Sequence, residues 1–450
     1  MAKYFGAVVG AALAAAVLVF AAPSVYPTGT TIYDPAKAWN GYTVLSPLAG
    51  PGAVVIDMNG NIVKQWDSYV SSAGGPARVL PGGVVMGAEG ANPPKQESLR
   101  LVERDFNGKE LWSYDHSEQI TRDGKMVWSA RQHHDWQRED FPAGYYAPGV
   151  NPSTQPGKTL VLTHTNHTQP KVAGNAILED DRILEIDKDG KILWEWIASD
   201  HIDEFKFDDD ARKAMASVPD FNAARGSFDW LHVNSATYLG PNHWFDEGDM
   251  RFAPNNVIIS SRESSLIAIV ARNGSIVWQM GPDYNATPEL RAIRQVIGQH
   301  NAHFIPKGLP GAGNVMVFDN GGASGYGRPS STAPKGKGIY SRPTSRVLEI
   351  DPVTLKLVWS YTATTFFATN ISGAQRLPNG NTMITEGPGG RLFEVTTDGT
   401  IVWEYIYPVS GAQRGNQVYR GNRLPYEWIP QLTRPREQAV TPPTSGYRVP

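Results

Sequence analysis

Cysteine is absent from the 450-residue sequence. Disulfide bonds, thiolate zinc sites and cysteine nucleophiles are therefore excluded, and histidine is left as the natural nucleophile or ligand. The chain also lacks a basic excess, because its formal net charge is -3. Such a surface offers no long-range attraction to nucleic acid, and we expect no nucleic-acid partner.

Two common catalytic signatures are missing as well. No glycine-rich phosphate loop leads from a strand into a helix, and there is no Gly-x-Ser-x-Gly nucleophile elbow. The chain is instead rich in turn formers and large aromatic residues, with 45 Gly, 34 Pro and 13 Trp. This composition is typical of an all-β protein with many short strands and turns.

The N-terminal segment has the layout of a targeting sequence. Lys3 precedes an apolar run from Phe5 to Ala22, and Pro23 follows the run. This arrangement is typical of a secretory signal or a single membrane anchor. We therefore assign residues 1–29 to this segment and predict a periplasmic or otherwise extracytoplasmic location, with membrane attachment through the N-terminus if the segment is retained.

An internal repeat predicts the architecture. Six times, an alternating apolar run leads through a turn, usually with Asp or Asn next to Gly, into a second run that ends near a tryptophan. VVIDMNGNIVKQW and LFEVTTDGTIVW are two copies, and the marking tryptophans are Trp66, Trp112, Trp196, Trp278, Trp359 and Trp403. Each copy predicts a β-hairpin, with its tryptophan packed against the neighbouring repeat.

A second pair of strands precedes most of these hairpins, as in Gly373–Gly387, which carries the turn Pro-Asn-Gly-Asn. Four strands per repeat predict a six-bladed β-propeller over residues 30–430, with a C-terminal tail at 431–450. The first hairpin lacks a full inner pair, so we expect residues 416–425 to complete its blade and close the ring. Short helical insertions are predicted within 200–217 and 288–299, and a long loop within 321–345.

The innermost strand of each blade lines the central channel of a propeller, so equivalent residues of these strands converge on one axis. Here the equivalent positions are polar, which predicts a shared site at the channel. They are His133, His134, Asp135, His232, Asn234, Ser235, His300, Asn301, His303, Gln375, Arg376, Tyr419 and Arg420. His164 and His167 are three residues apart in THTNHT, and we favour a loop or strand end over a metal pair because no carboxylate accompanies them.

Several segments of the chain resemble the bacterial arylsulfate sulfotransferases. The similar segments are DWLHVNSATYL, NNVIISSRESSLIAIV, GSIVWQMG, GQHNAHF and VFDNG, within a resemblance that covers Gly41 to Pro425. The resemblance implies a periplasmic six-bladed propeller that moves a sulfuryl group from an aryl sulfate to a phenol without a nucleotide donor. It also implies that His232 and His300 hold the sulfate and that Arg328, Arg342 or Arg346 is their cationic partner.

One position departs from that family. The histidine that becomes sulfated there follows the tryptophan that Trp359 matches, and here the stretch 361–377 contains no histidine. Another histidine must attack sulfur, or one must act as general base in direct transfer between phenols. We also expect a histidine placed at Phe366 or Phe367 to raise activity.

The sequence thus predicts a nucleotide-independent aryl sulfotransferase-like enzyme with small-molecule aryl sulfate and phenol substrates and with neither a metal nor another cofactor. The candidate catalytic residues are His134, His232, His300 and His303, and the candidate substrate-binding residues are Asn234, Arg328, Arg342, Arg346 and Arg376. The alternative is a non-catalytic extracytoplasmic propeller that binds a ligand or a partner protein. A quinone-dependent dehydrogenase fits less well, because no carboxylate-rich calcium site is present to orient that cofactor.

Overall fold

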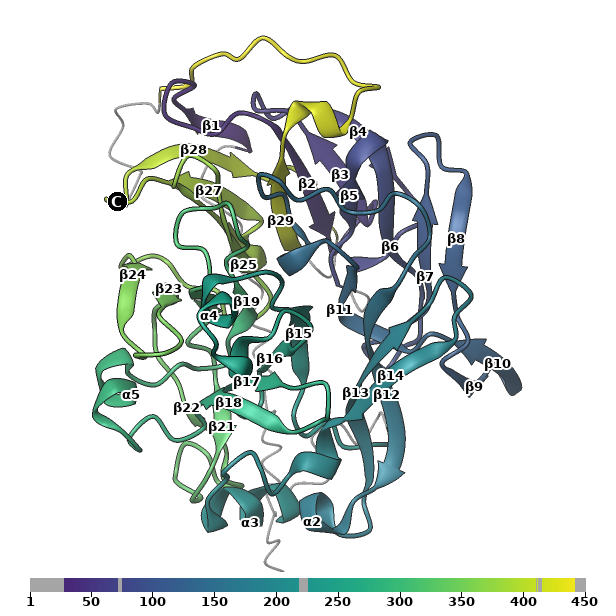
Figure 1. The fold of residues 1–450 in the computed structure, drawn as a ribbon, viewed down its shortest axis with the longest axis vertical. Helices are drawn as coiled ribbons and strands as arrows, with labels where there is room; N and C mark the ends of the chain where they lie inside the picture. Colours follow the sequence, from purple (N-terminus) through teal and green to yellow (C-terminus); the bar gives the residue numbers. More distant parts are fainter. Residues whose placement is uncertain (1–27, 72–74, 218–225, 410, 412–414, 442–450) are drawn as a thin grey trace, which may run out of the picture.

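The computed structural model describes residues 28–71, 75–217, 226–409, 411 and 415–441. Antiparallel sheets built from short strands are arranged around a central region in a β-propeller-like fold (Figure 1). The N-terminal segment expected to be a signal or anchor lies outside the described residues. Within the described part of the chain, no helix has the length and apolarity needed to cross a membrane.

Four sheets are separate units of the ring. Three have four strands each, and the fourth has five strands because β1 joins its outer edge. In order from the inside outward, the first contains β29 (Val418–Leu424), β2 (Tyr42–Pro47), β3 (Ala53–Ile56) and β4 (Ile62–Trp66). The second contains β15 (Val233–Tyr238), β16 (Val257–Ser261), β17 (Leu266–Val270) and β18 (Ile276–Met280). The third contains β19 (His300–Phe304), β20 (Val315–Asp319), β23 (Arg346–Ile350) and β24 (Leu357–Tyr361). The fourth contains β25 (Gly373–Arg376), β26 (Thr382–Glu386), β27 (Arg391–Val395), β28 (Ile401–Ile406) and β1 (Gly29–Tyr33).

The fifth large sheet has eight strands. One half contains β5 (Arg78–Leu80), β6 (Val84–Ala91), β7 (Ser98–Arg104) and β8 (Glu110–Tyr114). The other half contains β11 (Gln132–Arg138), β12 (Thr159–Thr168), β13 (Ile177–Ile186) and β14 (Ile192–Ile197). The halves are joined where Gln132 of β11 pairs with Ser98 of β7. The prediction of six separate four-stranded blades is therefore wrong in its count: the sheets form four separate blades and one continuous eight-stranded sheet.

Both ends of the chain contribute to ring closure. β29 pairs with β2 along most of its length, as predicted for residues 416–425. The pairing of β1 with β28 is a second closure that the sequence pattern did not indicate. The C-terminal segment also returns to the ring, because Tyr33 and Val440 exchange two backbone hydrogen bonds of 2.9 Å.

Insertions decorate this ring. Short α-helices occur at α2 (Pro170–Ala173), α3 (Asp209–Ser217), α4 (His243–Asp246) and α5 (Pro288–Ile293). Single 3₁₀ turns occur at Pro81–Gly83, Pro142–Gly144, Ala198–His201, Met250–Phe252, Gly387–Gly389 and Tyr426–Trp428. The helices α3 and α5 confirm the predicted helical insertions. The predicted long loop at 321–345 instead contains a small hairpin of β21 (Ser324–Tyr326) and β22 (Lys337–Tyr340), and a second hairpin pairs β9 (Glu118–Arg122) with β10 (Lys125–Ser129).

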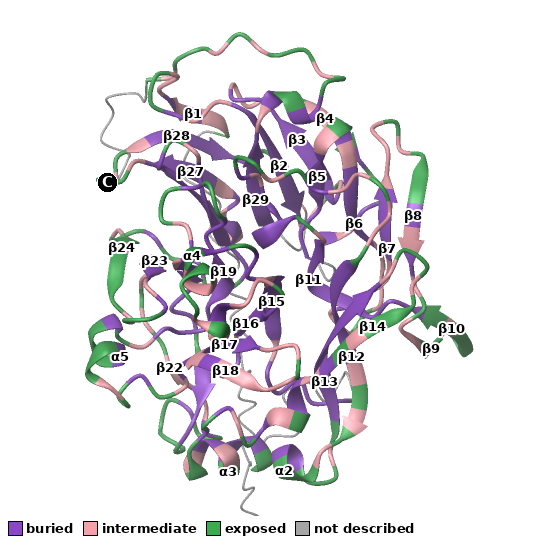
Figure 2. Ribbon diagram, viewed as in Figure 1, coloured by how far each residue is buried: buried purple, intermediate pink, exposed green. Residues whose placement is uncertain are grey.

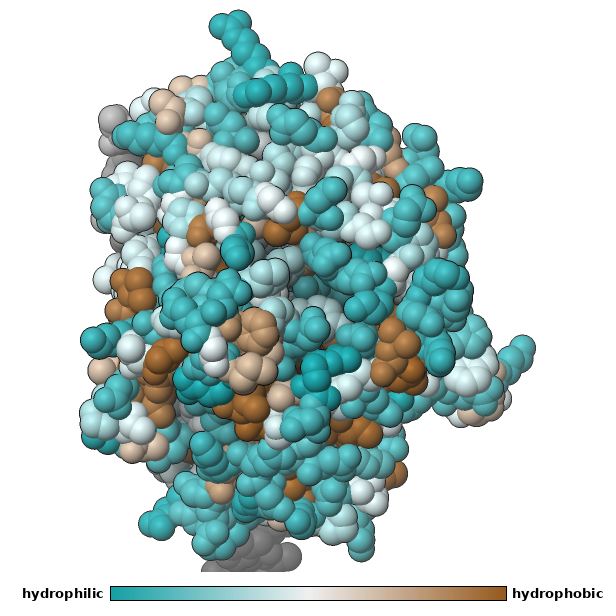
Figure 3. Space-filling model, in the orientation of Figure 1, coloured by the Kyte–Doolittle hydropathy of each residue, from teal (hydrophilic) through white to brown (hydrophobic). Residues whose placement is uncertain are grey.

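Burial follows the radial position of each strand. The inner strands are buried along their whole length, whereas outer strands such as β8 and β24 alternate between buried or half-buried and exposed residues (Figure 2). The face in Figure 3 is mainly hydrophilic with scattered apolar residues, as is usual for a soluble surface. The buried inner strands also carry many polar side chains, such as His134 of β11 and His300 of β19.

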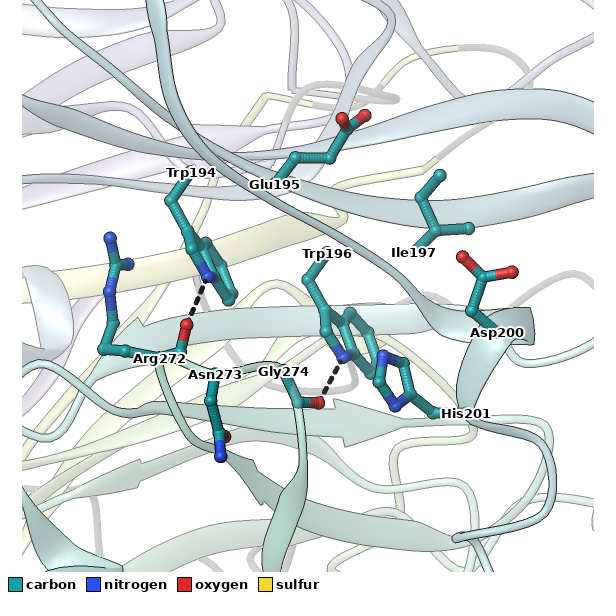
Figure 4. A pocket seen from close by; sticks show the side chains of 9 residues that line it. All are labelled: Trp194, Glu195, Trp196, Ile197, Asp200, His201, Arg272, Asn273 and Gly274. Carbon is teal, nitrogen blue, oxygen red and sulfur yellow. Dashed lines mark hydrogen bonds between the residues drawn. The ribbon is translucent and has the colours of Figure 1, made fainter.

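The repeated tryptophans join neighbouring sheets. Figure 4 shows Trp194 and Trp196 of β14 donating indole hydrogen bonds to the carbonyls of Arg272 and Gly274, in the turn between β17 and β18. The same contact recurs from Trp112 to Lys188 (2.7 Å), from Trp278 to Pro352 (2.8 Å), from Trp359 to Thr397 (2.8 Å) and from Trp403 to Met58 (2.9 Å). The last contact connects the end of the chain to its first hairpin, so these tryptophans lie between repeats as predicted.

Candidate functional site

The inner strands share an unusual backbone feature near the proposed site. His134 of β11, His232 just before β15 and Asn301 of β19 have positive φ angles of 53°, 52° and 56°. Residues with a Cβ rarely adopt this conformation, and it concentrates at functional sites. The strand register shifts across His134 and across Asn301, and it shifts again just after His232, between Val233 and Ser235. The irregular backbone turns these side chains away from the regular strand alternation.

His134 and His232 lie against each other. Their ring centroids are 4.6 Å apart, and the rings meet edge to face. The hydroxyl of Tyr419 on β29 donates a hydrogen bond of 3.2 Å to the carbonyl of His134. The structure thus brings together residues from β11, β29 and the start of β15, which are far apart in the sequence.

His232 forms a dyad with Asp229. The distance from its Nδ1 to the Asp229 carboxylate is 2.6 Å. A carboxylate only accepts hydrogen bonds, so Nδ1 is the donor in this contact, and Nε2 carries the lone pair in the neutral form of the ring. His232 is also the most exposed of the four candidate histidines, with 11 % of its side chain accessible. Asp229 was not predicted from the sequence, although its position three residues before the histidine in DWLH was visible.

His300 is held from both sides. Its Nδ1 lies 2.8 Å from the Asn320 side-chain oxygen, while its Nε2 accepts a hydrogen bond of 3.2 Å from the backbone N–H of Ile371. The Asn320 amide nitrogen donates to the carbonyls of Ala368 and Ile371, which assigns its oxygen as the acceptor of the Nδ1 proton. Both ring nitrogens already form hydrogen bonds, so we assign His300 a role in positioning the surrounding backbone.

His303 is also engaged at both ring nitrogens. Its Nδ1 lies 2.8 Å from the Asn301 carbonyl, and its Nε2 lies 3.0 Å from the Tyr145 hydroxyl. The ring is fully buried. His303 therefore has the contacts of a structural histidine beneath the site.

Burial favours the neutral form of three of these imidazoles, those of His134, His300 and His303. Desolvation lowers the pKa of His134 well below its ordinary value, and the charges of His232 and His300 lower it further. Desolvation and the nearby Arg262 charge likewise lower the pKa of His300. The pKa of His303 falls to about 4, mainly through desolvation. A neutral imidazole retains a lone pair, which a nucleophile or general base requires.

The buried cation at this site is Arg420. Its side chain is 2 % exposed, and none of its three guanidinium nitrogens has a hydrogen-bond partner among the described residues. Its guanidinium lies over the ring of Tyr419 at 5.3 Å from the centroid, and the hydroxyl of that ring reaches the carbonyl of His134. Its charge also lowers the pKa of His300 and His303. A buried, unpaired guanidinium is costly unless an anion compensates it. Arg420 was among the predicted channel residues but not among the chosen substrate-binding residues.

The arginines that the sequence favoured for substrate binding are engaged elsewhere. Arg342 and Arg346 both form ion pairs with the buried Asp319, at 2.8 and 2.6 Å. Arg376 pairs with Glu349 and lies over the ring of Trp359. The side chain of Arg328 is 83 % exposed and contacts Asp210 at the surface. Asn234 is buried near the site, where its amide nitrogen donates to the Gln299 carbonyl at 2.7 Å and its oxygen has no hydrogen-bond partner within the described part of the chain.

Residues 361–377 form the stretch in which the resemblance leads us to expect a nucleophilic histidine. One of the two phenylalanines in this stretch packs into the core. Phe366 is 1 % exposed within an apolar cluster beside Phe318 and Phe393. Phe367 is 40 % exposed. The residue of this stretch that contacts a channel histidine is Ile371, through its backbone N–H. The apolar packing of Phe366 therefore argues against it as a place to restore a catalytic histidine.

The pocket in Figure 4 is separate from the histidines. It is lined by β14 residues, by the turn that follows them and by the β17–β18 turn, and it contains His201 but none of the candidate catalytic residues. Its tryptophans are the inter-sheet contacts described above. We assign this pocket to sheet packing.

The fold and these side chains define a class: an all-β, propeller-like protein that carries a cluster of neutral histidines and a buried arginine on its inner strands. The family model for Arylsulfotransferase (ASST) matches residues 136–402, which is more than half of the chain. The chain belongs to this family. His232 and His300 lie inside the matched region, whereas His134 and Arg420 lie outside it and enter the site through the fold.

A search of the curated proteins returns no match. Among solved structures, a Bacteroides caccae protein of unknown function has a TM-score of 0.45 at 11% identity and covers 85% of this chain and 98% of its own. Virginiamycin B lyase from Staphylococcus aureus has a TM-score of 0.36 at 12% identity, with 88% and 93% covered. A europium-containing methanol dehydrogenase has a TM-score of 0.35 at 13% identity, with 85% and 69% covered. We draw no functional conclusion from these similarities.

Proposed function

We propose that this chain transfers a sulfuryl group from an aryl sulfate to a phenol, without a nucleotide donor, at the inner-strand site around His232. The observation that supports this most directly is the buried Arg420 guanidinium, which has no hydrogen-bond partner among the described residues, in a fold whose inner region also carries the His232–Asp229 dyad. Membership of the arylsulfotransferase family supports the same reaction. The proposal assigns the nucleophile to a residue other than the one the family uses.

Arg420 binds the sulfate group in this proposal. A guanidinium presents donors in a planar fork that matches the oxygens of an anionic group. His300 and Asn320 hold the neighbouring backbone in place through the contacts described above. Because the donors are fixed before the substrate arrives, they stabilise the charge that builds on the sulfate oxygens in the transition state.

His232 is the nucleophile. Its Nε2 attacks sulfur, an N–S bond forms, and the S–O bond to the donor breaks to release a phenolate. Asp229 stabilises the resulting cationic ring through Nδ1–H, as the carboxylate does in a catalytic triad. The acceptor phenol then attacks sulfur and breaks the N–S bond. The proton lost by the acceptor balances the proton gained by the released phenolate, and His134 is the adjacent imidazole that can carry it.

The test uses the purified protein with a chromogenic aryl sulfate and a phenol acceptor. We expect turnover in the parent, and a loss of about a hundredfold or more in His232→Ala, which is typical for a positioned nucleophile or base. His116→Ala is the control, because this histidine is largely exposed on a turn. Mass spectrometry after an acid-free quench should find the sulfuryl group on the peptide that contains His232.

Three other outcomes are informative. Turnover without a trapped adduct, but with the same loss in His232→Ala, favours direct transfer with His232 as general base. Full activity of His232→Ala contradicts the dyad mechanism. A parent that binds aryl sulfates but turns none over supports the alternative of a non-catalytic binding propeller.

A further inference from the structure

A small hairpin outside the blades reaches the segment that carries the His232–Asp229 dyad. Strands β21 and β22 are inserted between β20 and β23 of the third sheet, yet they lie beside the second sheet (Figure 1). The backbone N–H of Gly325 donates a hydrogen bond of 2.9 Å to the carbonyl of Glu263, in the turn between β16 and β17. The Ser324 and Ser265 hydroxyls lie 3.0 Å apart. The hairpin therefore connects its own sheet to a turn of the neighbouring sheet.

The dyad segment is held at three successive carbonyl groups. The Tyr326 hydroxyl of β21 donates to the Trp230 carbonyl at 2.6 Å. The backbone N–H of Glu263 donates to the Leu231 carbonyl at 3.2 Å, and that of the preceding residue donates to the His232 carbonyl at 3.0 Å. His232 has the positive φ described above, a conformation that persists only where surrounding contacts determine it. These contacts fix the backbone that sets the direction of the imidazole.

Lys337 of β22 is the charged residue that the hairpin places against this segment. Its side chain is 8% exposed, and its Nζ lies 3.0 Å from the carboxylate of Glu263. The same Nζ lies 5.9 Å from the ring centroid of Phe228, the residue before Asp229, and 5.7 Å from that of Tyr326. Aromatic faces attract a cation at such distances. Lys337 thus connects the hairpin, the β16–β17 turn and the start of the dyad segment.

The charge of Lys337 lies among buried carboxylates. Glu263 and Asp229 are both buried, and Glu263 forms ion pairs with Lys337 and Arg262. Desolvation lowers the pKa of Lys337, whereas the negative charges of Glu263 and Asp229 oppose this shift. Removing one partner of a buried ion pair leaves the other charge poorly compensated, which disturbs the surrounding structure. An uncharged side chain in place of Lys337 would therefore disturb Glu263, whose backbone N–H holds the Leu231 carbonyl.

We propose that the β21–β22 hairpin positions the His232–Asp229 dyad for attack on sulfur, with Lys337 and Tyr326 as the positioning residues. Neither side chain touches the reacting atoms. Tyr326 holds the backbone of the dyad segment, and Lys337 holds the carboxylate of Glu263 in the turn that supports this segment. This role rests on the proposed function, because a nucleophile must be held in line with the bond that it attacks.

Steady-state kinetics of the purified full chain, with the chromogenic aryl sulfate and phenol acceptor, test the role in catalysis. Lys337→Met should lower kcat by about tenfold to a hundredfold, the range expected when a reacting group is displaced by about 1 Å. KM should change by less than about threefold, because the sulfate-binding Arg420 is retained. Lys337→Arg keeps the charge and should retain most of the activity. Lys335→Met is the matched control, because Lys335 is exposed two residues earlier in the same insertion.

Tyr326→Phe removes one hydroxyl and leaves every charge in place. It should also lower kcat, by about tenfold and with little change in KM, because the Trp230 carbonyl loses its donor. This variant decides the kinetic test if Lys337→Met does not fold. A rise in KM with an unchanged kcat in either variant overturns the proposal, because it would place the hairpin in substrate binding.

NMR of ¹⁵N-histidine-labelled protein tests the support of the dyad without turnover. The two neutral tautomers of an imidazole differ in the ¹⁵N chemical shifts of the ring. At mildly alkaline pH the His232 ring, assigned by its absence in His232→Gln, should be the Nδ1–H tautomer in the parent, because Asp229 accepts that proton. Lys337→Met and Tyr326→Phe should shift part of the population to the Nε2–H tautomer, whereas Lys337→Arg and Lys335→Met should not.

The two measurements separate the possible failures. A parent without turnover contradicts the proposed function, and the tautomer of His232 then decides alone whether the hairpin supports the dyad. An Nδ1–H tautomer that is unchanged in both Lys337→Met and Tyr326→Phe overturns the positioning role of the hairpin, whether or not kcat falls.

Discussion

The proposed active site differs from the rest of the core in how its buried arginine is paired. Most buried arginines are paired, and Arg78, Arg131 and Arg138 form ion pairs with Asp135, Glu97 and Glu103. Arg420 has a comparable burial without such a partner. An unpaired buried charge destabilises the folded protein, so its presence usually has a functional reason. A bound anion would offset the charge of Arg420.

The first prediction concerns Arg420→Met. We expect this variant to retain or gain stability, by up to about 1 kcal/mol, because an unpaired buried charge is replaced by an apolar side chain of similar length. Its kcat/KM for an aryl sulfate should fall by about a hundredfold or more through loss of transition-state charge stabilisation. Thermal melts and steady-state kinetics measure the two effects.

Sulfate ions give the control for this prediction. At low millimolar concentration they should raise the melting temperature of the parent through binding, and raise that of Arg420→Met by less, because only the general salt effect remains there. A variant that loses stability and activity together would instead indicate a structural role for the arginine.

The second prediction concerns pH and His303. Its pKa is about 4 in the folded protein, whereas an unfolded histidine titrates near 6.5. Between these values the unfolded chain binds a proton that the folded chain does not, so the free energy of unfolding falls as the pH decreases from about 6.5 to about 4. The loss is up to roughly 3 kcal/mol for this group. Denaturant melts across this range measure it.

His303→Gln should reduce the pH dependence of stability, because one of the protons taken up on unfolding is removed. His116→Gln is the control, since that side chain is 64% exposed. An unchanged slope in His303→Gln would show that other groups cause the acid sensitivity.

Among the structural elements, the hairpins carry the contacts between repeats. Five of the six repeated tryptophans donate their N–H to a turn carbonyl of the next hairpin, as Trp403 does to Met58; the indole nitrogen of Trp66 has no such partner among the described residues. The burial of these rings varies: Trp403 is fully buried, whereas Trp194 and Trp359 are half-buried and lie beside Arg272 and Arg376. We therefore assign the larger stabilising contribution to Trp403.

The third prediction follows from this difference. Trp403→Ala should destabilise the protein by about 3 to 5 kcal/mol, the cost of removing a large buried ring. Trp403→Phe keeps most of the ring but loses the indole donor, and we expect a smaller cost of about 1 to 2 kcal/mol. Trp359→Ala should also cost less than Trp403→Ala because its ring is partly solvated. Equal melting temperatures for the three variants would contradict this ranking.

For the whole molecule, the decisive feature is how the ring closes. β29 comes from the end of the chain and completes the sheet that starts near the beginning. Arg423 of β29 reinforces this closure: it is fully buried and donates to Thr43 at 2.7 Å, to the Trp39 carbonyl at 2.8 Å and to Glu394 at 3.0 Å. One side chain thus connects the closing strand with β2 of its own sheet and with β27 of the neighbouring sheet.

The fourth prediction tests this closure. Arg423→Met should lower the free energy of unfolding by about 3 to 5 kcal/mol, because it leaves the Glu394 carboxylate buried without its cation. The double variant Arg423→Met/Glu394→Gln removes that charge and should recover a large part of the loss. Thermal melts of the two variants provide the comparison. If the double variant is no more stable than the single one, the ion pair is not what secures the closure.

The sequence by itself determined the features that depend on residues close together along the chain. Alternating apolar runs separated by turns specify hairpins, because side-chain direction in a strand has a period of two. The recurrence of these runs predicted the propeller-like fold, the closing role of 416–425 and the tryptophans between repeats. Equivalent positions in successive repeats also placed His134 and His232 on one site.

Only the tertiary structure decided which of these residues are paired. Arg342 and Arg420 are both arginines in the sequence, but Asp319 neutralises the first and nothing described neutralises the second. The merging of two repeats into one eight-stranded sheet, and the meeting of His164 with Asp181, a carboxylate of the neighbouring strand that the sequence pattern did not indicate, depend in the same way on contacts between separate strands. Pairing energies act over a few ångströms in space, and the local pattern of a sequence does not record which distant groups the fold brings within that range.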